Sequence, residues 1–157
     1  KGISILTNLL EKDGLLLLGL YSEKARQGIE IIKNYAKKNN FHNTLSDIRK
    51  FREKIFNEEK DLDFKNLSNR KDFFSTSSVR DLIFHSHEIT YNLKQVFNML
   101  EDLNLEFLGF CGDQIKNKYS KMFPDDKKCI SLKNWEIFEK KYPHTFFGMY
   151  KFWVKRK

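Results

Sequence analysis

Residues 75–88 of this chain of 157 residues combine histidines with other ionisable side chains in a short segment. Within nine residues the segment has Arg80, Asp81, His85, His87 and Glu88. Imidazole titrates near neutral pH, so His85 and His87 are candidate general bases, and Glu88 is a candidate proton acceptor beside them. Five such groups are costly to bury without tight pairing or a task, which favours a functional site. We therefore assign His85, His87 and Glu88 to catalysis.

Two alternative interpretations of this segment are an internal ion pair and a metal site. Arg80 and Asp81 are candidates for substrate binding, but an arginine beside a carboxylate also forms internal ion pairs that brace a packed segment. The His-x-His-Glu order could hold a metal ion, but its spacing differs from the HExxH pattern and no further His or Cys cluster lies near it in the sequence. We predict no metal site.

A second candidate group follows the leucine run, at Tyr21, Ser22, Glu23 and Arg26. Ligands of α/β proteins bind outside the carboxyl ends of the strands, which is where these side chains would lie. The Tyr21 hydroxyl and the Arg26 guanidinium can orient an acidic or carbonyl-bearing substrate. The alternatives are that Ser22 caps the next helix, and that Tyr21 is a partly buried ring while Arg26 forms a surface ion pair with Glu23 or Glu30.

Helices and strands alternate along the chain, which predicts an α/β fold. The continuous leucines over 15–20 predict a strand that is apolar on both faces, as in the interior of a parallel sheet. Further strands are predicted over 105–110 and 146–154. Apolar residues three or four apart, with capping residues, predict the helices. These cover 3–10, 23–39, 44–57, 78–84, 92–103, 113–122 and 131–141, with a polar loop over 58–72. The predicted core includes Leu16, Leu18, Leu100, Leu105, Phe107 and Phe152.

Several segments, taken in order, resemble a known family. The first of these segments is Leu10-Glu11-Lys12-Asp13-Gly14 with the leucine run that follows it. It is similar to the segment leading into the fifth strand of class I S-adenosylmethionine-dependent methyltransferases. The segments 19–26, 47–52, 72–88 and 105–110 resemble the methyltransferase domain attached to tetratricopeptide repeats in many bacterial proteins. The block that begins Asp72-Phe73-Phe74-Ser75 and runs to Glu88 is the most specific part. The resemblance covers nearly the whole chain.

The resemblance implies the C-terminal portion of a Rossmann-like methyltransferase sheet with three strands, the last one antiparallel and inserted between the other two. It also implies one incomplete domain over 1–157, with a helical lid inserted at 23–91. We expect Phe74, Ser75, Arg80 and Asp81 to bind the methyl acceptor, an unknown substrate, together with Tyr21 and Arg26. The glycine-rich loop that binds S-adenosylmethionine in this family is absent from the chain, so the cofactor is expected in the full-length protein and not tightly bound here.

The composition of the chain limits the classes of binding partner and the cellular compartment that we expect. The net charge of +8 can attract nucleic acid, but the lysines are spread along the chain without a stacking platform of aromatic residues, so nucleic-acid binding is not favoured. No apolar run reaches the length of about 20 residues that a membrane span needs. The two cysteines are far apart, which is consistent with a cytoplasmic, reduced protein. A non-catalytic scaffold module derived from a methyltransferase is the main alternative, and upstream repeats would supply a protein partner.

Overall fold

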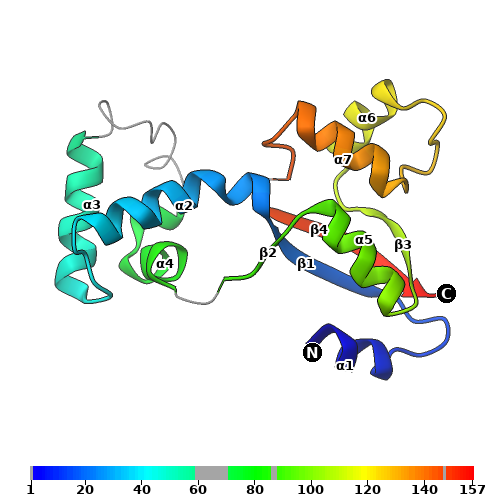
Figure 1. Ribbon diagram of the computed structural model, residues 1–157, viewed down its shortest axis with the longest axis horizontal. Helices are drawn as coiled ribbons and strands as arrows, with labels where there is room; N and C mark the ends of the chain where they lie inside the picture. Colours follow the sequence, from blue (N-terminus) through cyan, green and yellow to red (C-terminus); the bar gives the residue numbers. More distant parts are fainter. Residues whose placement is uncertain (1, 59–70, 86–87, 147) are drawn as a thin grey trace. The chain divides into compact units, whose positions relative to one another are not determined.

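The computed structural model describes residues 2–58, 71–85, 88–146 and 148–157 (Figure 1). The chain divides into two compact units: Lys1–Ala25 together with Ile89–Lys157 form the first, and Arg26–Glu88 form the second. The two ends of the chain therefore build the first unit, and one continuous segment builds the second. The single domain with an insertion at 23–91 stays a prediction.

The first unit contains a mixed sheet of four strands, in the order β2-β1-β4-β3. The strands are β1 (Leu16–Ser22), β2 (Thr90–Tyr91), β3 (Leu105–Phe110) and β4 (Met149–Arg156). The last strand, β4, lies antiparallel between β1 and β3, which confirms the expected insertion. The parallel neighbour β2 was not predicted, because two residues are too short to show an alternating pattern.

The leucine run of β1 is covered on one face in the described structure. Leu18 and Leu20 are buried, whereas Leu15 and Leu17 are 58% and 48% exposed. Leu17 pairs with Trp153 across the sheet, and that ring is also partly exposed. Within this chain β1 therefore lies between a parallel and an antiparallel neighbour and buries one face, and the expectation that both faces are covered in a larger α/β domain stays a prediction. Apolar side chains indicate a preference for burial, but the segments that cover them depend on the tertiary fold.

Helices cover the other face of the sheet. The first unit has α1 (Gly2–Leu9), α5 (Leu93–Asp102), α6 (Asp113–Met122) and α7 (Leu132–Lys141). Helices α5 and α7 pack against each other, and their apolar stripes join the buried side of the sheet in one core (Figure 1). Of the predicted core residues, Leu18, Leu100, Leu105, Phe107 and Phe152 are buried and Leu16 is half-buried. The caps form locally: the Ser131 hydroxyl accepts a hydrogen bond from the Asn134 N–H at 3.3 Å.

The second unit is helical. It contains most of α2 (Glu23–Lys38), then α3 (Leu45–Glu58), a 3₁₀ helix (Lys71–Phe74), α4 (Thr76–Val79) and a π-helical turn (Arg80–Phe84). Its own apolar core includes Ile29, Ile48, Phe51, Phe73 and Val79. The cap predicted for α3 is present, since Thr44 Oγ1 accepts a hydrogen bond from the Asp47 N–H at 3.1 Å. The predicted loop over 58–72 lies almost entirely outside the described residues.

The predicted helix over 78–84 begins earlier and changes type. Ser75 caps α4, so the helix starts at Thr76, and at Arg80 the chain continues as a π-helical turn.

Among the helices that the structure describes, none combines the length and the apolar character that a membrane span requires.

Candidate functional site

The carboxyl end of β1 carries a buried polar cluster that lies entirely within the first unit. Ser22 is the last residue of β1 and is fully buried. Its hydroxyl donates a hydrogen bond to Glu139 Oε1 at 2.9 Å, and the Ala25 N–H donates to the same hydroxyl at 3.2 Å. Ser22 therefore caps the start of α2, as the sequence alternative expected, and also binds a carboxylate that the sequence analysis did not select.

Glu139 is the centre of this cluster. Its side chain is 1% exposed on α7, and the Tyr150 hydroxyl of β4 donates to both of its carboxylate oxygens, at 2.8 and 3.0 Å. The Lys24 ammonium of α2 lies 3.9 Å from Glu139 Oε2. We call Ser22, Lys24, Glu139 and Tyr150 the Glu139 cluster. It joins β1, the first turn of α2, α7 and β4 at one point.

Burial dominates the electrostatics of the cluster. It raises the pKa of Glu139 above the usual range, against the hydrogen bonds from Tyr150 and Ser22 and the charge of Lys24, which lower it. Burial also raises the pKa of Tyr150, which therefore stays a hydrogen-bond donor. A buried carboxyl with a raised pKa can take up a proton at a pH where an exposed glutamate stays ionised, and such groups are frequent at functional sites.

A second buried polar group lies within the second unit. Arg26 Nε is 2.8 Å from Glu88 Oε1, and the two side chains are only 7% and 8% exposed. Lys33 Nζ lies 3.7 Å from Glu88 Oε2 and 3.1 Å from Glu30 Oε1. Arg26 and Glu88 are the first and last residues of this unit, so the pair closes the segment between them. We call it the Arg26–Glu88 pair.

The structure thus brings together two residues predicted to act at a site, but as an ion pair. The sequence alternative for Arg26 is an ion pair at the surface, whereas the structure has its side chain buried against Glu88. The two charged groups lie in contact as a buried ion pair. This geometry favours a role for Glu88 in positioning Arg26.

Ser75 and Phe74, two further candidates for substrate binding, form hydrogen bonds within the second unit. Ser75 accepts a hydrogen bond from the Ser78 N–H at 3.0 Å as the cap of α4. Phe74 is 65% exposed, and its carbonyl accepts from Arg52 Nη2 at 3.1 Å.

The charged residues that follow lie nearer to solvent. Asp81 and His85 are exposed and Arg80 is half-buried. Between the described side chains of Arg80 and Asp81 there is no ion pair within 4.0 Å, so the predicted brace is not formed by these two neighbours. His87 lies outside the described residues.

Tyr21 belongs to the first unit, unlike the other predicted site residues. It is half-buried in β1 and pairs in register with Thr90 of β2 and Met149 of β4. The cleft expected to join Tyr21 with Arg26 and residues 75–88 stays a prediction.

Metal-ligating side chains do not gather in the described part of the chain, where no group of three or more His, Cys, Asp or Glu side chains could hold a metal ion. The expectation that S-adenosylmethionine is held outside this chain stays a prediction.

Sequence reasoning missed Glu139 and Tyr150 as polar residues of a buried site. A signal was present in α7, because Glu139 stands four positions after Trp135 and next to Phe138, both of which are fully buried. A carboxylate on the apolar stripe of an amphipathic helix must be paired or hydrogen-bonded. Tyr150 gave no comparable signal, since a tyrosine in an alternating strand is ordinary core.

No protein-family model matches the sequence, and no curated protein matches it. Among solved structures, the chain is similar to PKMT2 from Rickettsia typhi, with a TM-score of 0.65 and 10% sequence identity. The similarity covers 99% of this chain and 31% of that chain, so the chain spans about a third of the protein it matches. At this identity the similarity concerns the fold: this chain has an α/β fold that is structurally like part of a methyltransferase.

Proposed function

We propose that this chain is the substrate-side part of an S-adenosylmethionine-dependent methyltransferase whose acceptor is a lysine side chain of a protein. The observation that carries the proposal is the sheet, in which β4 lies antiparallel between β1 and β3, together with the similarity to PKMT2. That protein is a lysine methyltransferase, and its name suggests the acceptor. The cofactor would be held by a part of the protein that this chain does not contain.

The residues of this chain would act on the acceptor. A lysine amine is protonated at neutral pH and must lose a proton before it can act as a nucleophile. His85 is exposed, and a neutral imidazole nitrogen can accept a proton, so we assign the proton acceptor to it. Arg80 and Asp81 would hold the acceptor peptide, and Glu88 would position Arg26. The same proposal includes a protein partner that is recruited through repeats upstream of this chain.

The test uses the longer protein that contains this chain, with its upstream sequence. Purified protein is incubated with methyl-labelled S-adenosylmethionine and a lysine-rich protein substrate, and label transfer is measured together with the folded fraction. We expect His85→Ala to lower turnover by roughly a hundredfold or more, because general bases contribute at least that much. His42→Ala, an exposed histidine of the same unit, is the matched control and should leave turnover unchanged. Full turnover in folded His85→Ala would overturn the assignment.

A non-catalytic scaffold module is the second candidate, and a specific observation favours it. The Arg26–Glu88 pair and the Ser75 cap give three predicted site residues structural partners, as expected if the segment only braces a fold. In that case the upstream sequence would lack a glycine-rich loop after a strand, and the longer protein would not transfer label. Label transfer that depends on His85 would reject the scaffold.

A further inference from the structure

A groove between α5 and α7 of the first unit is not used by the proposed methyl transfer. It has a volume of about 820 Å³ and is lined by residues of α5, β3, α7 and the segment just before α7. Its floor is apolar and consists of Leu93, Leu100, Leu105, Phe107 and Leu132, all of them buried. This volume lies within the range of about 300–1,000 Å³ that is typical of small-molecule pockets.

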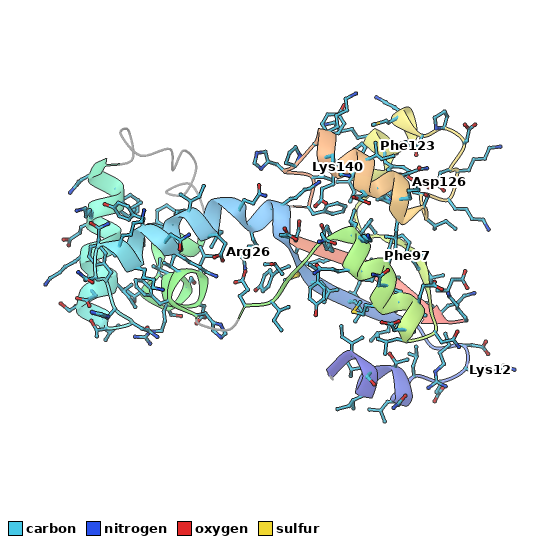
Figure 2. The ribbon with its side chains drawn as sticks, in the orientation of Figure 1. Lys12, Arg26, Phe97, Phe123, Asp126 and Lys140 are labelled. Atoms are coloured by element: carbon cyan, nitrogen blue, oxygen red, sulfur yellow. The ribbon has the colours of Figure 1, made fainter. Side chains whose placement is uncertain are left out.

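Apolar side chains also stand on the rim of the groove. Phe97 of α5 and Ile130, just before α7, line it and are 50% and 39% exposed; Phe97 is labelled in Figure 2. Such side chains lose contact with water when an apolar ligand covers them. The floor and the rim therefore suit an apolar ligand body.

The acidic side chains of the lining have basic partners. Glu101, Glu106 and Glu136 line the groove and form ion pairs with Lys157, Lys155 and Lys140, in that order. The hydrogen bond from Lys140 lowers the pKa of Glu136, and the charges of Lys140, Lys24 and Lys94 add to that effect. The three carboxylates therefore do not leave the groove negative.

Two lysines of the lining form no direct ion pair. Lys94 and Lys133 line the groove, and neither forms an ion pair with any side chain in the described parts of the chain. Each is the second residue of its helix, α5 or α7. The helix dipole disfavours a positive charge in the first turn, so these ammonium groups and the two helix N-termini make this part of the groove positive.

We propose that the α5–α7 groove binds a small anionic amphiphile, with its apolar body on the floor of the groove and its carboxylate between Lys94 and Lys133. The apolar lining supplies the affinity for the body. Lys94 and Lys133, which form no direct ion pair in the described parts of the chain, supply the preference for a negative head. The site is independent of methyl transfer, because it lies between two helices and needs none of the residues assigned to the acceptor.

The probe is dodecanoate, and dodecyltrimethylammonium is the control with the same chain and the opposite charge. Each displaces a fluorescent apolar dye from the 157-residue chain at moderate salt, below its micelle concentration. We expect dodecanoate to bind about tenfold tighter than the cation, and the Lys94→Gln/Lys133→Gln variant to lose about that factor, because exposed charge pairs contribute modestly. Lys127→Gln/Lys128→Gln removes the same charge from an exposed turn and should leave the affinity unchanged.

Amide chemical shifts locate the bound probe. Saturable shifts confined to α5, α7 and β3 support the groove. Shifts elsewhere, equal affinity for the two amphiphiles, equal loss in both double variants, or no saturable binding would each overturn the proposal. Both double variants replace exposed side chains, so thermal unfolding should show that they stay folded.

Discussion

At the scale of single residues, the Glu139 cluster places a carboxylate where water cannot reach it. Three hydrogen bonds from Tyr150 and Ser22 replace water around its oxygens, and the Lys24 ammonium lies nearby. Burial without such donors would cost several kcal/mol. The cluster thus explains how a glutamate is tolerated on the buried stripe of α7, and it makes the folded state sensitive to protonation.

Glu139→Gln should change how stability depends on pH. Because burial raises the pKa of Glu139 above its usual value of 4.5, the folded chain keeps this proton at a pH where the unfolded chain has lost it. The stability of the natural protein should therefore fall relative to the variant as pH rises from about 4.5 through the folded pKa. Urea denaturation of both proteins between about pH 4 and pH 8 measures this difference.

A matched control isolates the effect. Glu53→Gln removes an exposed carboxyl, so its stability should run parallel to that of the natural protein across the same pH range. A difference between the natural protein and Glu139→Gln that stays constant with pH, or grows in favour of the natural protein, would contradict the raised pKa.

At the scale of elements, the Arg26–Glu88 pair ties the start of the helical segment in α2 to its end after the π-helical turn. Glu88→Gln should destabilise the second unit by about 3–5 kcal/mol, because it removes one charge of a buried ion pair. Arg26→Met should cost less, since Lys33 still lies 3.7 Å from Glu88. Hydrogen exchange of the α2 and α4 amides reports this unit directly.

The neighbouring Glu30 supplies the control for that pair. Its side chain is 55% exposed although it contacts Lys33, so Glu30→Gln should cost less than about 1 kcal/mol. The outcome to compare is the exchange rate of the α2 and α4 amides in the two variants. If these amides exchanged no faster in Glu88→Gln than in Glu30→Gln, the Arg26–Glu88 pair would not be what holds the ends of the second unit together.

Aromatic rings pack together in the core of the first unit, and Phe107 of β3 is one of them. Its ring centroid lies 5.0 Å from that of Phe110 and 5.6 Å from that of Phe152. Phe107→Ala should cost about 3–5 kcal/mol in the free energy of unfolding if the site cannot collapse. Phe97→Ala, at a half-exposed ring of α5, should cost far less. A loss below about 1 kcal/mol for Phe107→Ala would remove that residue from the core.

At the scale of the whole molecule, the fold is structurally like part of PKMT2, and we propose that the cofactor is held outside this chain. Isothermal titration of the isolated chain with S-adenosylmethionine should therefore show no micromolar binding, because the glycine-rich loop is absent. The longer protein serves as the positive control. Tight binding by the isolated chain would mean that the cofactor site lies among these residues and that the substrate-side assignment is wrong.

The sequence by itself determined the elements whose signals are local. The 3.6-residue spacing of Leu93, Val96 and Leu100 predicted α5, the apolar run over 105–110 predicted β3, and Thr44 and Ser131 marked the starts of two helices. Each signal depends on residues within one or two turns of one another. Short-range backbone geometry is therefore enough to decide them.

Only the tertiary structure decided which polar side chains meet. Ser22 and Glu139 are 117 positions apart, and Arg26 pairs with Glu88 at the other end of the second unit. The sequence shows that a buried charge needs a partner, but the partner is set by which elements the fold brings together. The same reason explains the exposed face of β1. Apolar side chains favour burial, but the arrangement of the other segments determines whether they are covered.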